Sequence, residues 1–116
     1  MFKPRWGGLA PAPAMLMFAA VAGLSAQAWA GSSERGRSKS HACVACHGVD
    51  GLSARPDAPH LAGQPAIYLR EQLHLFRDGK RVTPVMSVVA KPLSDEDIED
   101  LAEWYSSIEI QVKLPR

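Results

Sequence analysis

Only two cysteines occur in the 116-residue chain, and a histidine directly follows the second, in the pentapeptide Cys43-Val44-Ala45-Cys46-His47. This C-x-x-C-H spacing is typical of the covalent attachment of a c-type haem. Residues i and i+3 of a helical turn share a face, so both thiols can bond to the vinyl groups along one haem edge. The motif therefore predicts one haem c, held through two thioether bonds to Cys43 and Cys46, with His47 as an axial ligand of its iron.

Other chemistry is compatible with the same residues. The two thiols could form a disulfide or a thioredoxin-type redox pair, and two cysteines with two histidines could bind zinc. A thioredoxin site requires strands on either side of a helix, and no segment here has a convincing strand pattern. A zinc site would need a further ligand from His41, His60 or His74, and none of these stands at a recognised spacing. Haem attachment is the favoured interpretation.

Residues 1–30 have the features of a cleaved secretory signal peptide. Lys3 and Arg5 form a basic start, an apolar run extends from Leu9 to Leu24, and Ala28-Trp29-Ala30 places small residues at the cleavage positions. The alternative is an uncleaved anchor, but this run has 16 residues, fewer than the roughly 20 that cross a bilayer. We therefore expect residues 31–116 to form a single-haem domain in the periplasm, without stable membrane insertion.

Charge and size restrict the function of residues 31–116. Lys3 and Arg5 account for two of the 13 basic residues, so residues 31–116 contain 11 basic and 12 acidic side chains. They show no basic stripe that would indicate nucleic-acid binding. A domain of 86 residues buries only a modest core. A haem would supply the missing apolar centre, so we expect the haem-free protein to be poorly folded.

The sequence pattern predicts an all-α fold of three to four helices around the covalently attached haem. A short helix is expected to run into the haem motif, a loop to follow residues 48–51, a second helix to cover 65–77 and an extended loop to cover 79–93. The last helix begins at Ser94 with a Ser-x-x-Asp cap. Its acidic run from Asp95 to Asp100 is expected to serve mostly as a cap and a solvated face, with docking of a partner as the alternative.

Met86 is the only methionine left once residues 1–30 are removed. A methionine ordinarily fills gaps in a core. Here it follows His47 by 39 residues, beyond a helix that can fold over the haem, and His/Met pairs recur as axial ligands of haem iron. Met86 is therefore the predicted second ligand. For Pro59, a carbonyl that accepts the imidazole N–H and a rigid turn without that contact are equally compatible with the sequence.

Three runs of residues and several single positions together form a specific pattern. The runs are Cys43-Val44-Ala45-Cys46-His47-Gly48, Pro59-His60-Leu61-Ala62-Gly63-Gln64 and Leu93-Ser94-Asp95-Glu96-Asp97-Ile98, and the single positions are Tyr68, Leu69, Gln72, Leu73, Phe76, Gly79, Arg81, Met86 and Ala90. From about Gly36 to Ser107, this pattern resembles class I c-type cytochromes, and among them a single-domain member of the cytochrome c-four group. Cytochromes c-four usually have two such domains, whereas this chain has one motif and no internal repeat.

The resemblance implies a small cytochrome c fold. It implies that Cys43 and Cys46 carry the haem, that His47 and Met86 bind the iron, that the Pro59 carbonyl orients His47 and that Arg81 approaches a haem propionate.

The expected function is single-electron transport in the periplasm rather than catalysis on a substrate. By resemblance, the partners are a quinol-oxidising complex or a dehydrogenase on one side and a terminal oxidase or reductase on the other. Two alternatives stay open. The chain could be a haem subunit fixed in a periplasmic dehydrogenase complex, or, if Met86 does not bind iron, a gas-binding or peroxidatic haem protein.

Overall fold

The computed structural model describes residues 30–115, so the predicted signal peptide lies outside the described residues except for Ala30. These residues form five helices: α1 (Ser33–Lys39), α2 (His41–His47), α3 (Ala66–Arg77), α4 (Met86–Val89) and α5 (Asp95–Ser106). Between residues 30 and 115 there is no strand, and the predicted all-α class is confirmed. None of the described helices has both the length and the apolar character that crossing a membrane requires.

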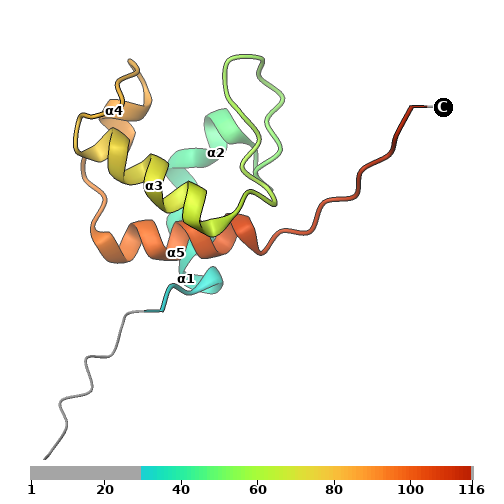
Figure 1. The fold of residues 1–116 in the computed structure, drawn as a ribbon, viewed down its shortest axis with the longest axis horizontal. Helices are drawn as coiled ribbons and strands as arrows, with labels where there is room; N and C mark the ends of the chain where they lie inside the picture. The colour runs from blue at the N-terminus through green and yellow to red at the C-terminus, as the bar shows by residue number, and fades with distance from the viewer. Residues whose placement is uncertain (1–29, 116) are drawn as a thin grey trace, which may run out of the picture.

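Helix α5 is the element on which the other long helices pack. Ser94 caps it in a capping box: its hydroxyl accepts a hydrogen bond from the Asp97 N–H, and the Asp97 carboxylate accepts one from the Ser94 N–H. This start of the helix agrees with the sequence prediction. Helices α1 and α3 both contact α5, and in Figure 1 α2 and α4 stand on the same side of it, with α3 in front.

The core lies between α3 and α5. Leu69, Leu101, Ala102 and Tyr105 form its buried cluster, against which Cys43 of α2 and Leu61 pack from the side of the haem motif. Leu73 of α3 also contacts the cluster but is only partly buried. A core of this size is small for a domain, as the length of the chain predicts.

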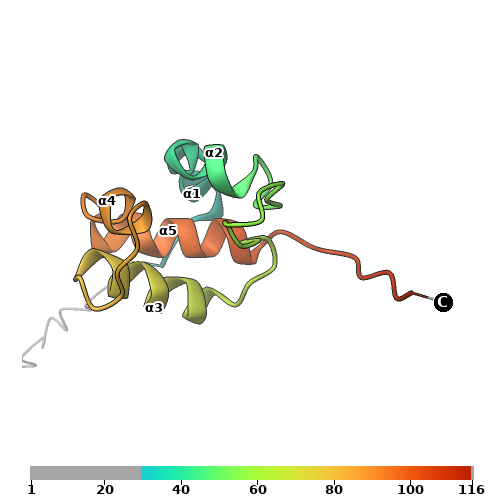
Figure 2. The ribbon, with the colours of Figure 1, turned by 90° about the horizontal axis from the view of Figure 1, so that it is seen from above.

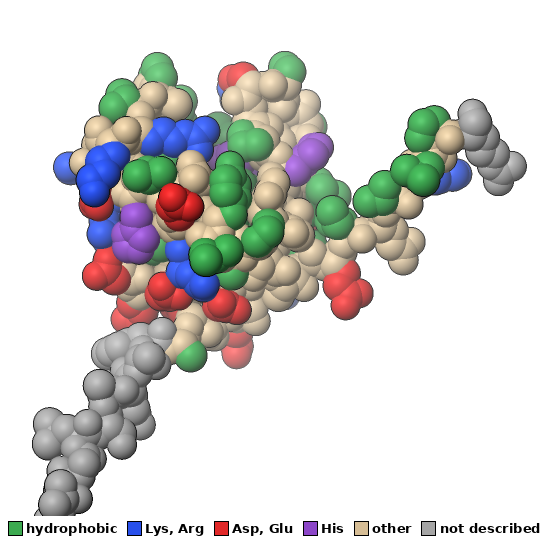
Figure 3. Space-filling view, viewed as in Figure 1, with side chains coloured by type: hydrophobic (Ala, Val, Ile, Leu, Met, Phe, Trp, Pro, Cys, Tyr) green, Lys and Arg blue, Asp and Glu red, His purple; other side chains and the backbone are tan. Residues whose placement is uncertain are grey.

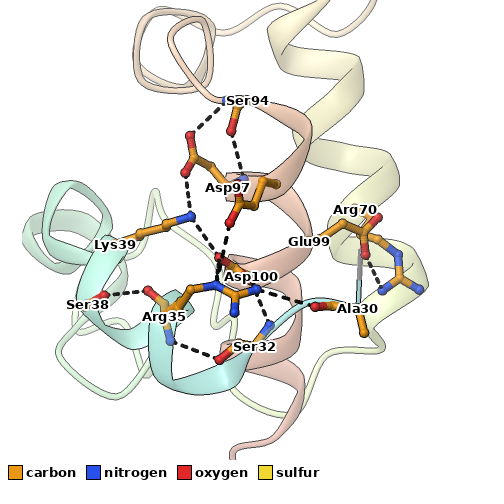
Figure 4. Close-up of polar contacts among 11 residues, drawn as sticks. Ala30, Ser32, Arg35, Ser38, Lys39, Arg70, Ser94, Asp97, Glu99 and Asp100 are labelled. Carbon is orange, nitrogen blue, oxygen red and sulfur yellow. Dashed lines mark hydrogen bonds and ion pairs between the residues drawn. The ribbon is translucent and has the colours of Figure 1, made fainter. Parts of the chain in front are cut away.

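One acidic residue of α5 lies where the sequence pattern did not predict it. Asp100 was expected on a solvated face, but its side chain is completely buried against α1. Its carboxylate accepts hydrogen bonds from the Ser32 N–H at 2.7 Å and from Arg35 Nη2 and Lys39 Nζ at 2.8 Å each, as Figure 4 shows. Burial alone raises the pKa of Asp100, but the hydrogen bonds from Arg35, Lys39 and Ser32 outweigh it and lower the pKa well below its usual range.

The segment 79–93 differs from the extended loop that was predicted, because one helical turn, α4, forms within it. The reason is a pair of local side-chain contacts. The Met86 N–H donates to Thr83 Oγ1 at 3.1 Å, and the Thr83 N–H donates to Ser87 Oγ at 3.0 Å. Such side-chain caps satisfy backbone groups that a short helix leaves free, and here they define where the turn begins.

Candidate functional site

Helix α2 consists almost entirely of the C-x-x-C-H motif. Cys43 and Cys46 are both free thiols and are partly buried, so the disulfide alternative finds no support in the structure. Burial raises the pKa of the Cys43 thiol. The three-residue spacing within one helix places both sulfur-bearing side chains on a common face.

His47 ends this helix, and only 6% of its surface is exposed. Its Nδ1 atom lies 2.8 Å from the carbonyl oxygen of Pro59. A carbonyl oxygen can only accept a hydrogen bond, so this contact requires the proton to be on Nδ1. The Nε2 atom then keeps its lone pair and is the ring nitrogen able to bind a metal ion.

The loop of residues 48–62 brings Pro59 back to the haem motif. At its base, the Gly51 carbonyl accepts hydrogen bonds from the Leu61 N–H at 2.7 Å and the Ala62 N–H at 3.1 Å. Gly51 has a φ of +71°, and a Cβ there would come within 2.9 Å of the Tyr105 ring. A glycine at this position therefore lets the loop close directly on the core.

Met86 is the first residue of α4 and is partly buried. Figures 1 and 2 agree that α4 and α2 lie on the same side of α5. Figure 3 shows that the surface is hollowed between the lobe that contains α4 and the loop that follows α2. Met86 therefore lies on the same side of α5 as the C-x-x-C-H motif of α2.

Arg81 lies after α3 and is exposed. Its Nη1 donates a hydrogen bond to Gln72 Oε1, and its guanidinium carbon is 4.6 Å from the centre of the Phe76 ring. The side chain therefore packs along α3, and its predicted approach to a haem propionate stays a prediction.

The residues present fit one covalently attached haem. Two free thiols, an imidazole whose Nε2 is available and a thioether form the donor set that holds haem in c-type sites with His/Met ligation. These residues do not favour a zinc site, because residues 30–115 contain no cluster of three His, Cys, Asp or Glu side chains that could hold a metal ion.

Sequence reasoning gave four residues no supporting role in this site. Thr83 and Ser87 define the start of α4, and Ser53 and His60 form hydrogen bonds around the Pro59 loop. Only the position of His60 directly after Pro59 could have drawn attention to it, since the other contacts depend on the folded loops.

Comparison with known proteins agrees with this site. Residues 33–109 match the family described as cytochrome c. The chain is 46% identical over 83 residues to cytochrome c-554(548) of Halomonas halodenitrificans, which covers 69% of this chain and 100% of that protein. It is 44% identical over 93 residues to a protein of Thiomonas intermedia named thiosulfate dehydrogenase electron acceptor, covering 77% of this chain and 42% of that one.

A solved structure is also similar. Reduced recombinant cytochrome c4 from Pseudomonas stutzeri superposes with a TM-score of 0.66 and 42% identity, over 69% of this chain and 47% of that one. The chain thus spans the whole of the Halomonas protein but less than half of the cytochrome c4 and of the Thiomonas protein. Its motif Cys43, Cys46 and His47 binds one haem c. The chain belongs to the cytochrome c family, whose members transfer electrons.

Proposed function

We propose that this electron-transfer protein works with His47 and Met86 as the two axial ligands of its haem iron, in the periplasm, after removal of residues 1–30. The observation that carries the ligand assignment is the contact of His47 Nδ1 with the Pro59 carbonyl, which leaves Nε2 for the metal. When bound, haem c supplies an iron that alternates between the ferrous and ferric states.

Residues of the chain set the reduction potential of the haem iron. The Pro59 carbonyl accepts the His47 N–H, which fixes the tautomer and raises the basicity of the ring, so it favours the ferric state. A thioether from Met86 favours the ferrous state and raises the potential. Thr83 and Ser87 hold the start of α4 and with it the position of Met86. Arg81 turns from Gln72 toward a haem propionate in this proposal.

The partners are redox proteins. The Thiomonas relative is named as the electron acceptor of a thiosulfate dehydrogenase, which supports a dehydrogenase as one class of electron donor. A quinol-oxidising complex is the other donor class, and a terminal oxidase or reductase is the acceptor.

The visible spectrum of the reduced protein, before and after adding carbon monoxide, tests the ligand set. Sharp low-spin bands that do not change with the gas are expected, because a sixth ligand occupies the iron. Conversion to a carbonyl spectrum would contradict ligation by Met86 and favour the gas-binding or peroxidatic alternative.

A fixed dehydrogenase subunit is the second candidate. It is favoured by a structural match, with a TM-score of 0.62 and 33% identity, to thiosulfate dehydrogenase (TsdBA) from Marichromatium purpuratum, where 66% of this chain aligns with 19% of that one. Gel filtration of the native protein from a periplasmic extract distinguishes the two. Elution as a free small protein supports the carrier, and elution with a large dehydrogenase supports the subunit.

A further inference from the structure

Hydrogen bonds and peptide bonds around His47 form a closed ring. From His47 Nδ1 the ring passes to the Pro59 carbonyl at 2.8 Å and through one peptide bond to His60. His60 Nδ1 accepts the Ser53 N–H at 2.9 Å. The Ser53 hydroxyl donates to the Cys46 carbonyl at 2.7 Å, and one more peptide bond returns the ring to His47.

We propose that Ser53 and His60 are positioning residues that hold the Pro59 carbonyl against His47 and so help to set the haem potential. The proposal rests on His47 as an iron ligand. Ser53 ties the loop to the end of α2, and His60 ties Pro59 to Ser53, so the ring restrains both partners of the His47 contact. Without these two bonds, the peptide that carries the Pro59 carbonyl is free to move away from the imidazole.

The positioning role of His60 can be tested separately from the stability of the loop. The loop has other ties that do not pass through the ring: the Gly51 carbonyl bonds at its base, and an exposed pair between Arg55 and Asp57 at 2.7 Å. Removal of the His60 acceptor leaves all of these bonds in place. The loop is therefore expected to stay folded while the His47 contact weakens.

Position 60 offers a matched control. Asparagine places its Oδ1 on the same side-chain carbon that carries Nδ1 in histidine, so His60→Asn can still accept the Ser53 N–H, whereas His60→Ala cannot. Asp57→Asn weakens the Arg55 pair in the same loop without touching the ring, and it controls for general loosening.

The experiment uses reduced holoprotein and NMR. It measures the deuterium exchange rate of the His47 ring N–H, and a redox titration at neutral pH gives the midpoint potential. His60→Ala and Ser53→Ala are expected to exchange about fivefold faster, the factor that loss of one hydrogen bond corresponds to, and to have a higher potential. His60→Asn and Asp57→Asn are expected to match the wild type in both measurements.

The outcomes are distinct. Unchanged exchange and potential in His60→Ala, or a His60→Asn variant that behaves like His60→Ala, would overturn the positioning role while leaving ligation intact. If the wild-type His47 ring N–H shows no haem-induced shift, ligation by His47 itself fails and the positioning role fails with it. A wild-type exchange rate and potential in His60→Asn, together with changed values in His60→Ala, support the positioning role.

Discussion

The backbone of Gly36 in α1 lies directly against the carbonyl oxygen of Asp100 in α5, where a Cβ atom at position 36 would come within 1.9 Å of that oxygen. A close helix crossing of this kind admits only glycine. Gly36→Ala is therefore expected to destabilise the holoprotein by about 2 kcal/mol, because the overlap outweighs the helix propensity that alanine adds. Denaturant unfolding measures this, with exposed Ser38→Ala in the same helix as the control. Equal stability of the two variants would show that α1 can move away without cost.

Asp100 makes folding sensitive to acid. Its pKa is lower in the folded protein than the unfolded value of about 3.9, so its contribution to stability is present above that value and is lost as the pH falls toward the folded pKa. Asp100→Asn is expected to cost about 2 kcal/mol at neutral pH, since charged hydrogen bonds from Arg35 and Lys39 are lost. It should also flatten the dependence of stability on pH below about pH 4.

Unfolding free energies measured between about pH 7 and about pH 3 check this. Asp57→Asn removes an exposed carboxylate whose partner Arg55 is also exposed, and it is the control, for which no measurable change in stability is expected. If Asp100→Asn kept the acid sensitivity of the wild type, another carboxylate would be its source.

Replacement of Met86 by alanine tests the sixth iron ligand. The variant is expected to bind carbon monoxide in its reduced form and to lose at least about 0.1 V of potential, a fraction of the roughly 0.8 V that axial ligands can span. Optical spectra and redox titration measure both effects. Val88→Ala, an exposed change in the same short helix, should leave spectrum and potential unaltered. A Met86→Ala protein with the wild-type spectrum would remove Met86 from the site.

Thr83 is expected to hold the methionine in place. Its hydroxyl accepts the Met86 N–H, so Thr83→Ala should weaken the Met86 bond to iron and raise the apparent affinity of the ferric protein for imidazole by about fivefold. Thr83→Ser keeps the hydroxyl and serves as the matched variant. An imidazole titration in which alanine and serine behave alike would show that the hydroxyl has no part in ligation.

Removal of the haem is expected to abolish native-like folding. The buried cluster of Leu69, Leu101, Ala102 and Tyr105 is small, and partly buried side chains such as Leu73 would lose an apolar partner. Protein made without haem attachment should show a broad thermal transition by circular dichroism, against a cooperative one for the holoprotein. A sharp, cooperative transition in the haem-free protein would contradict this.

The sequence by itself determined the features that depend on neighbouring residues. The C-x-x-C-H spacing within one helical turn sets the haem chemistry, and Ser94 with Asp97 sets the start of α5, because both act over a single turn. The tertiary structure decided the rest. It brought Pro59 and His60 to α2, and it buried Asp100 against α1 and its N-cap Ser32, with contacts to residues 61 to 68 positions away. Contacts over such distances depend on how loops close and helices cross, which local residue patterns do not encode.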